Sequence, residues 1–306
     1  MKIIDAHMHF SKIQALWLGA LDSTVNYSAE GLLKECSDNN VVACVCMGLS
    51  ETAPGLTPDK LAENPMLVDL DVPPIQMGIN LGINPYKLDE ECLERIEQKI
   101  ITDKKRTFDF ETGNNKSKSP PHTFISGFKI YAGYYHVNIN DDIYMPIYKI
   151  ATEHNLAVAI HGGETYFKDG LIEYSHPLHV DRLAYNFKDL KIIICHMGFP
   201  WVMDACEMAT KNKNVHIDIS GLAVGGVKEC ELMRNEPLIR DYFRQGLVFL
   251  NNYDKVIFGT DWPLVPLGPY IEACKSLIPY KAWEDVFYNN ALRVYTQLQE
   301  PNTQLK

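Results

Sequence analysis

The sequence predicts an α/β protein with the fold of a (β/α)8 barrel, or TIM barrel. Apolar segments of strand length recur along the chain, and most are followed by a segment with helical periodicity. Alternating strands and helices build a parallel sheet with helices outside, and eight such units close into a barrel. Because barrels of this kind have about this length, residues 1–306 are expected to form a single domain.

A doubly wound open sheet is the alternative fold. It would need a glycine-rich phosphate-binding turn after the first strand, and the sequence has none there.

The first predicted strand begins at Ile3 and ends in two histidines, His7 and His9, separated by one residue. The two isoleucines at its start favour a strand. Because side chains alternate between the faces of a strand, we expect Asp5 to share one face with both histidines, which can then bind one metal ion. In a helix, positions 7 and 9 would lie about 200° apart.

The remaining elements follow from the same patterns. Predicted strands are Val41–Met47, Ile75–Leu81, Phe124–Tyr131, Leu156–His161, Leu190–His196, Val215–Ser220 and Lys255–Asp261. Predicted helices run from the Ser28 cap to Asn39 and over Asp89–Ile101, Ile143–His154, 178–188, Trp201–Lys211, 228–250, 269–278, 281–287 and 289–298. Loops that shape a pocket are expected at 11–27, 49–75, 102–123 and 162–180. Aromatic residues there and nearby predict a partly apolar substrate: Trp17, Tyr27, Tyr134, Tyr135, Tyr166, Phe167 and Trp262.

Composition narrows the class of protein. The formal net charge of −10 argues against nucleic acid as a partner, because phosphate binding needs clusters of Lys and Arg. The eight cysteines form no Cys-x-x-Cys motif and are predicted to be buried, reduced thiols. The sequence shows neither a signal-peptide pattern nor an apolar run of the roughly 20 residues that span a membrane. We therefore expect a cytoplasmic enzyme that acts on a small molecule and has no membrane partner.

Polar residues gather at the ends of the predicted strands. In a barrel, the carboxyl ends of all strands meet at one mouth, where the chemistry takes place. The residues that would meet there are His7, His9, Lys129, His161, His196, Asp218 and Asp261.

Four of these residues form a plausible metal set, His7, His9, His161 and Asp261. Three neutral imidazoles and a carboxylate suit Zn²⁺ or a similar divalent ion and leave a position open for water. Such a metal lowers the pKa of its water toward 7. Asp261 is expected to contact the metal and to accept the proton of the water, and His196 to polarise a carbonyl or to shuttle a proton.

Each residue taken alone has an ordinary structural interpretation. His161 would be a core histidine, Asp261 a helix cap, and Lys129 an ion-pair residue. Asp218 would be the buried hydrogen-bonding partner of a ligand histidine, and His216 would lie below the mouth. The joint pattern favours the metal site.

In these motifs the chain resembles the amidohydrolase superfamily, specifically its amidohydrolase 2 branch of metal-dependent hydrolases. The resemblance runs from Asp5-Ala6-His7-Met8-His9 to Gly259-Thr260-Asp261-Trp262-Pro263. It implies a (β/α)8 barrel whose metal is bound by His7, His9, His161 and Asp261. His196 matches the strand-six histidine of the family, which is catalytic in mononuclear members and a second-metal ligand in binuclear ones.

The resemblance leaves two activities open. The branch contains hydrolases of amides, esters and lactones, and also nonoxidative decarboxylases of small aromatic or unsaturated acids. A decarboxylase needs a cation near the departing carboxylate, and no arginine lies at a predicted strand end, so a hydrolase is expected and a decarboxylase is the alternative.

The number of metals depends on Lys129. In binuclear members a strand-four lysine is carboxylated and bridges two metals, while Lys129 could equally bind a substrate carboxylate or be structural. We expect one Zn²⁺, with Mn²⁺ as the alternative and a second metal only if Lys129 is carboxylated. The family is often oligomeric, so a homo-oligomer is a further expectation.

Overall fold

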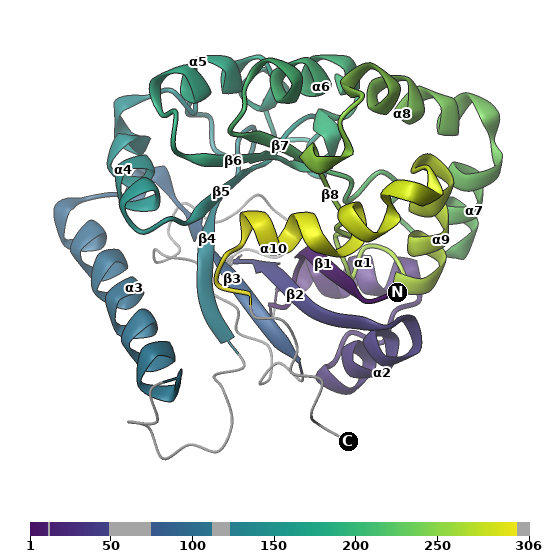
Figure 1. Cartoon of the computed structure of the whole chain (residues 1–306), viewed down its shortest axis with the longest axis horizontal. Helices are drawn as coiled ribbons and strands as arrows, with labels where there is room; N and C mark the ends of the chain where they lie inside the picture. Colours follow the sequence, from purple (N-terminus) through teal and green to yellow (C-terminus); the bar gives the residue numbers. More distant parts are fainter. Residues whose placement is uncertain (12, 49–74, 112–122, 299–306) are drawn as a thin grey trace.

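Eight parallel strands form a barrel in the computed structural model, which describes residues 1–11, 13–48, 75–111 and 123–298 (Figure 1). The strands are hydrogen-bonded in sequence order: β1 (Ile3–Met8), β2 (Val41–Met47), β3 (Gln76–Ile83), β4 (Thr123–Ile130), β5 (Ala157–Ile160), β6 (Lys191–Ile194), β7 (Val215–Asp218) and β8 (Val256–Ile257). Backbone hydrogen bonds from Ala6 N–H to the Phe258 carbonyl, and from His9 N–H to the Trp262 carbonyl, join the last strand to the first. The predicted TIM barrel is therefore confirmed.

Helices surround the strands, as Figure 1 shows. They are α1 (Gln14–Ser23), α2 (Ala29–Asn39), α3 (Glu90–Glu111), α4 (Met145–Glu153), α5 (His179–Asn186), α6 (Val202–Lys211), α7 (Val227–Asn235), α8 (Pro237–Leu250), α9 (Leu267–Leu277) and α10 (Asn290–Val294). Within the described ranges, no helix is long and apolar enough to cross a membrane.

The core has two layers. Outward-facing strand residues such as Ile192 and Ile194 pack under the helices, while inward-facing ones such as Ile193 and Ala159 fill the barrel interior. Residues of α10 and the segment up to Leu298 pack into the inner layer and close the end of the barrel opposite the mouth. All eight cysteines are buried and unbridged, as predicted.

Two predicted loops contain helix. Residues 14–23 form α1, and Tyr27, predicted as an aromatic residue of this loop, is buried with its hydroxyl donating to the Ser11 carbonyl. The helix was missed because Gln14–Ser23 is apolar around most of its circumference and lacks a capping side chain, so it shows no amphipathic period. α3 likewise continues to Glu111, into the segment predicted as the loop 102–123. The predicted loop 49–75 lies, apart from Ile75, outside the described residues.

The single predicted helix at 228–250 is instead two helices. Glu236 lies between them in an extended conformation, because Pro237 disfavours helical geometry in the residue before it and itself begins α8. The predicted strands six to eight also end early, so that His196 and Asp261 lie on turns after β6 and β8 rather than on strands.

The first strand does not alternate as predicted. Ile4 and Ala6 pack inside the barrel, but Met8 packs in the outer layer with Ile3. The register with β2 is irregular between Asp5 and Met8, and this irregularity shifts the later side chains to the other face. The prediction that Asp5 shares a face with His7 and His9 is therefore wrong.

His216 makes stability depend on pH. Its ring is largely buried on the inner face of β7, and burial together with the nearby Lys255 lowers its pKa to about 3. The unfolded chain binds this proton at a higher pH than the folded chain does, so stability falls as pH drops below about 6.5. We expect His216→Gln to flatten the urea-unfolding stability curve between pH 6.5 and 4.5 by up to about 1.4 kcal/mol per pH unit. Parallel curves for the two proteins would contradict this assignment.

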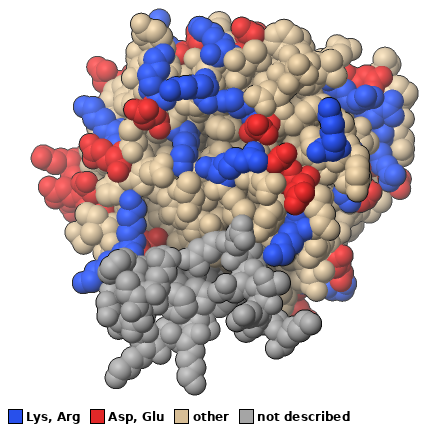
Figure 2. All heavy atoms as spheres, in the orientation of Figure 1, with Lys and Arg blue, Asp and Glu red and all other residues tan. Residues whose placement is uncertain are grey.

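Charged side chains of both signs are interspersed on the face drawn in Figure 2. The described residues of that face therefore show no patch of a single sign that would steer a charged partner.

Candidate active site

A pocket of about 380 Å³ opens at the carboxyl ends of the strands. Its lining brings together six residues singled out in the sequence, from five different strands or the turns that follow them: His7, His9, Lys129, His161, His196 and Asp261. Asp218, the seventh, lies beneath them and is 1% exposed. The convergence predicted from the strand ends is thus present in the fold.

In two of the histidines, a contact with a backbone carbonyl determines which ring nitrogen carries the proton. His9 Nδ1 lies 3.2 Å from the Met47 carbonyl oxygen, and His161 Nε2 lies 2.9 Å from that of Glu164. A carbonyl oxygen only accepts hydrogen bonds, so these ring nitrogens carry the proton and the opposite nitrogens present lone pairs. Burial lowers the pKa of both rings, which keeps them neutral at pH 7.

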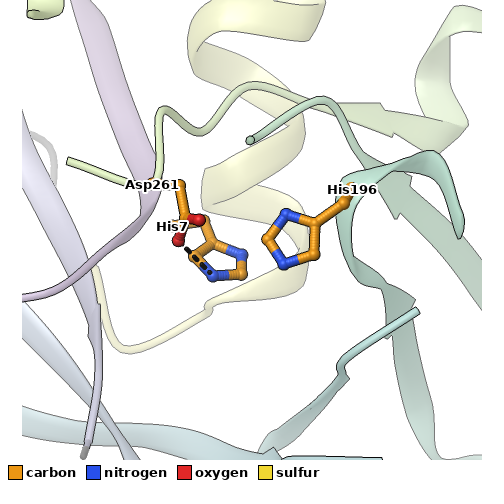
Figure 3. Close-up of side chains that lie close together, drawn as sticks. All are labelled: His7, His196 and Asp261. Atoms are coloured by element: carbon orange, nitrogen blue, oxygen red, sulfur yellow. Dashed lines mark ion pairs between the residues drawn. The ribbon is translucent and has the colours of Figure 1, made fainter. Parts of the chain in front are cut away.

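His7 is held in the same way by a carboxylate. Its Nδ1 lies 2.8 Å from Asp218 Oδ2, which leaves Nε2 facing Asp261 Oδ1 at 3.3 Å (Figure 3). Both of those atoms are buried without a hydrogen-bond partner. His9 Nε2 points at the same oxygen of Asp261 from 3.1 Å. Asp261 Oδ1 therefore has a histidine nitrogen close by on each of two rings, His7 Nε2 and His9 Nε2. A cation bound beside this oxygen would satisfy these electron-pair donors.

The pKa shifts agree with a cation at this point. Burial and Lys129 would lower the pKa of His7, but Asp218 and Cys195 outweigh them and hold it well above its usual value. Burial would raise the pKa of Asp261, but the neighbouring side chains of His7, His9 and His196 hold it well below its usual value. Both shifts favour positive charge beside the Asp261 carboxylate, in the place that a divalent metal would take. The residues present fit such a metal.

The predicted ligands are not all equally close. His7, His196 and Asp261 each offer a ligand atom within 4.8 Å of the others. His161 lines the same pocket, with its ring centre 5.0 Å from that of His196 and its Nδ1 left free. A second group of potential ligands, His7, Cys195 and Asp218, lies just below.

Two of the site residues have strained backbones. Asp261 has φ 71° and His196 has φ 58°, both in the left-handed region that residues other than glycine avoid. Hydrogen bonds hold them there, since Asp261 N–H donates to the His7 carbonyl at 2.7 Å and His196 N–H donates to Asp218 Oδ1 at 2.8 Å. Such strain costs about 1–3 kcal/mol per residue and is typical of functional sites.

Asp5 lies below the pocket, where its carboxylate accepts hydrogen bonds from the surrounding backbone and from Thr260. Its Oδ1 accepts from the backbone N–H groups of His7 and Thr260, and its Oδ2 accepts from the Thr260 hydroxyl at 2.5 Å. Burial raises its pKa to about 7. Asp5 therefore ties β1 to the turn that carries Asp261. No local pattern assigns a role to Thr260, because it lies 255 positions from Asp5.

Gly221 permits the close approach of two site residues. It has φ +60°, and a Cβ at this position would lie 2.8 Å from His196 Nδ1 and 3.2 Å from Asp261 Oδ2. We expect Gly221→Ala to destabilise the fold by about 1–3 kcal/mol and to displace His196. Thermal unfolding and metal content measure the two effects, with Gly226→Ala, where a Cβ meets nothing nearer than 3.8 Å, as the control. Equal unfolding temperatures for the two variants would contradict the expectation.

Lys129 is buried and donates to Cys195 Sγ at 3.0 Å, with its Nζ 5.5 Å from the centre of the Tyr131 ring. Tyr131, which sequence reasoning did not single out, lines the pocket and donates from its hydroxyl to the Gly48 carbonyl at 2.7 Å.

The aromatic prediction is confirmed only in part. Tyr134, Tyr166 and Phe167 line the pocket, together with Tyr131 and Phe199. The described pocket lining does not include Trp17, Tyr27, Tyr135 or Trp262.

Structures with the same fold include proteins of different activity. An uncharacterized TIM-barrel protein from Bordetella bronchiseptica is 19% identical, with a TM-score of 0.66 over 97% of this chain and 99% of that one. The 2,6-dihydroxybenzoate decarboxylase from Rhizobium is 13% identical, with a TM-score of 0.61 over 97% and 99%. A probable 2-pyrone-4,6-dicarboxylic acid hydrolase from Acinetobacter baumannii is 12% identical, with a TM-score of 0.56 over 97% and 100%. At these identities the likeness concerns the fold alone.

Sequence comparison identifies the family. Among curated protein sequences none matches this chain. A family model described as amidohydrolase matches residues 122–297, which is more than half of the chain and includes the segments that carry Lys129, His161, His196 and Asp261. With the barrel and the resemblance of its strand-end motifs, this match shows that the chain belongs to the amidohydrolase 2 family.

Proposed function

We propose that this member of the family is a metal-dependent hydrolase of an amide, ester or lactone bond in a small molecule. The observation that carries the proposal is the pair of buried, unpartnered electron-pair donors His7 Nε2 and Asp261 Oδ1, 3.3 Å apart, with His9 Nε2 3.1 Å from the same oxygen, in the lining of the 380 Å³ pocket. His7, His9, His161 and Asp261 would hold one Zn²⁺, with Mn²⁺ as the alternative. When bound, the ion supplies Lewis acidity and lowers the pKa of a water molecule toward 7.

Side chains of the pocket supply proton transfer and substrate binding. His196 presents an unprotonated Nε2, since its Nδ1 donates to the Ser220 carbonyl at 3.1 Å, and it is the group that takes or returns a proton. Asp261 Oδ1 lies 3.3 Å from His7 Nε2 and 3.1 Å from His9 Nε2, so that the three atoms would share the ion, and Asp261 would also accept a proton from the water molecule. Tyr134, Phe167 and Phe199 provide apolar surface for the substrate.

A nonoxidative decarboxylase is the second candidate, and Lys129 is the observation that favours it. Among the described residues that line the pocket, Lys129 is the only lysine or arginine, and its ammonium group could hold a carboxylate. The likeness to the Rhizobium decarboxylase supports the same candidate at the level of fold. We favour hydrolysis because the described lining lacks the arginine that a departing carboxylate usually requires.

One metal is proposed rather than two. The four predicted ligands, His7, His9, His161 and Asp261, are enough for one four-coordinate ion.

Two further proposals concern the state of the protein in the cell. The eight unbridged cysteines support a reducing compartment such as the cytoplasm. Leu238, Tyr242 and Phe249 are exposed and lie on one face of α8, and this apolar surface supports self-association. Cell fractionation and light scattering during size exclusion would test the two points.

The first experiment is elemental analysis of protein purified without added metal or chelator, followed by a screen of the loaded protein. About one equivalent of zinc is expected, and lactones, esters and amides are expected to incorporate ¹⁸O from labelled water. Release of CO₂ from aromatic acids without ¹⁸O incorporation would instead favour the decarboxylase. Two equivalents of metal would point to a carboxylated Lys129. Protein that holds no metal and acquires neither zinc nor manganese would contradict the proposal.

A further inference from the structure

We propose that Ser220 is a positioning residue that joins His196 to the carboxylate of Asp218, so that a single carboxylate orients both a metal ligand and the proton-carrying histidine. The chemical role of His196 rests on the proposed function, but the linkage itself rests on geometry alone.

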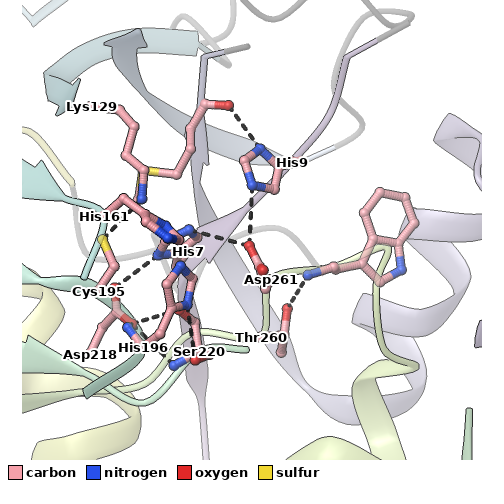
Figure 4. A network of polar contacts seen from close by, with 12 residues as sticks. His7, His9, Lys129, His161, Cys195, His196, Asp218, Ser220, Thr260 and Asp261 are labelled. Atoms are coloured by element: carbon pink, nitrogen blue, oxygen red, sulfur yellow. Dashed lines mark hydrogen bonds and ion pairs between the residues drawn. The ribbon is translucent and has the colours of Figure 1, made fainter. Parts of the chain in front are cut away.

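Asp218 is the centre of this arrangement (Figure 4). Its Oδ2 accepts from His7 Nδ1 at 2.8 Å. Its Oδ1 accepts from the backbone N–H groups of His196 and Ser220, at 2.8 Å and 3.1 Å, and from the Ser220 hydroxyl at 2.5 Å. The carboxylate is 1% exposed, so water does not compete for these bonds.

The directions of these hydrogen bonds follow from what each group can do. An ionised carboxylate only accepts hydrogen bonds, so the Ser220 hydroxyl donates its single proton to Asp218. The hydroxyl oxygen must then act as the acceptor toward His196 Nδ1, which lies 2.9 Å away. The Ser220 carbonyl accepts from the same nitrogen at 3.1 Å. Both acceptors require the proton on Nδ1, so Nε2 faces the pocket with a free lone pair.

The local sequence explains how one short segment supplies both groups. Asp218 ends β7 and Ser220 follows two residues later, so that both side chains turn toward the barrel interior while the intervening Ile219 packs in the outer core layer. His196 is held from two sides, since its backbone N–H and its ring bind the same Asp218–Ser220 pair. The ring is thereby fixed 4.8 Å from the ring of His7.

This linkage prepares His196 for a positive charge. When Nε2 takes a proton, the imidazolium keeps its Nδ1–H on the Ser220 hydroxyl, and the Asp218 carboxylate lies directly behind that hydroxyl. Hydrogen bonds to charged groups are roughly twice as strong as neutral ones, so the chain strengthens at the moment when the proton arrives.

The test uses NMR of ¹⁵N-histidine-labelled full-length protein, metal-free and loaded with zinc. The His196 ring signals are assigned by their loss in His196→Asn. In the wild type we expect one Nδ1–H tautomer, with this proton protected from exchange with water. Ser220→Ala removes one of the two acceptors and should speed the exchange of that proton about fivefold, which is the effect of one ordinary hydrogen bond. The zinc content and the His7 Nδ1–H signal should stay unchanged.

Two further variants distinguish loss of the linkage from a general structural change. Ser220→Thr retains the hydroxyl and should restore slow exchange, which separates the linkage from a packing defect. Asp218→Asn should disturb both histidines, because its NH₂ group faces a donor whichever way the amide is turned, and zinc affinity should fall about 10- to 100-fold.

The outcome separates this inference from the proposed function. An unchanged His196 signal in Ser220→Ala would overturn the linkage, whatever Asp218→Asn does and even if the enzyme is an active hydrolase. A changed signal supports it even in protein that binds no zinc, because the spectra are also recorded without metal.

Discussion

Replacing His7 by alanine is expected to abolish metal binding and activity together. His7 Nε2 and Asp261 Oδ1 are buried and face each other without a hydrogen bond, so His7→Ala removes a ligand and also leaves Asp218 without the partner of its Oδ2. A bound metal contributes several kcal/mol to catalysis, so turnover should fall by more than about 10³-fold. Elemental analysis and the rate on the best substrate of the screen measure both losses.

The matched control is His136→Ala. His136 lies outside the pocket, with its Nε2 on the Asp169 carbonyl, and its removal should leave both metal and rate unchanged. His7→Ala protein that still holds one equivalent of zinc would contradict the ligand assignment. Loss of zinc in both variants would instead indicate a general effect of histidine removal.

Replacing His196 by asparagine should separate chemistry from metal binding. Its Nε2 is unprotonated and lies at the pocket wall, and burial lowers the pKa of the ring to about 4, which keeps it neutral at pH 7. A positioned proton-transfer group contributes about 10²–10⁴-fold to the rate, and kcat should fall by that factor. The zinc content should stay near one equivalent.

Steady-state kinetics and elemental analysis on the same preparation check this expectation. His176→Asn is the control, since His176 packs against Trp201 outside the pocket. Loss of zinc from His196→Asn would reassign His196 as a ligand, in agreement with its place in the tight group with His7 and Asp261. An unchanged kcat would remove it from the proton transfer.

The sequence by itself determined the architecture and most of the candidate site. Buried strands of a parallel barrel are continuous apolar runs, so Val41–Met47 and its counterparts are visible without any tertiary information. The barrel topology then brings the carboxyl ends of those strands to one mouth, and this places His7, His161, His196 and Asp261 in one pocket. Because imidazole and carboxylate groups are the usual ligands of divalent metals, these residue types also predict the metal site.

Only the tertiary structure decided how these groups are held. The irregularity in β1 that separates Asp5 from His7 depends on its pairing with β2, and a one-residue shift reverses which face each side chain occupies. The helix α1 owes its position to burial against the barrel rather than to an amphipathic pattern. The proton positions of the histidines depend on contacts with distant residues, such as His7 with Asp218, 211 positions away. Local sequence patterns cannot predict such contacts, because distant residues meet only when the barrel closes.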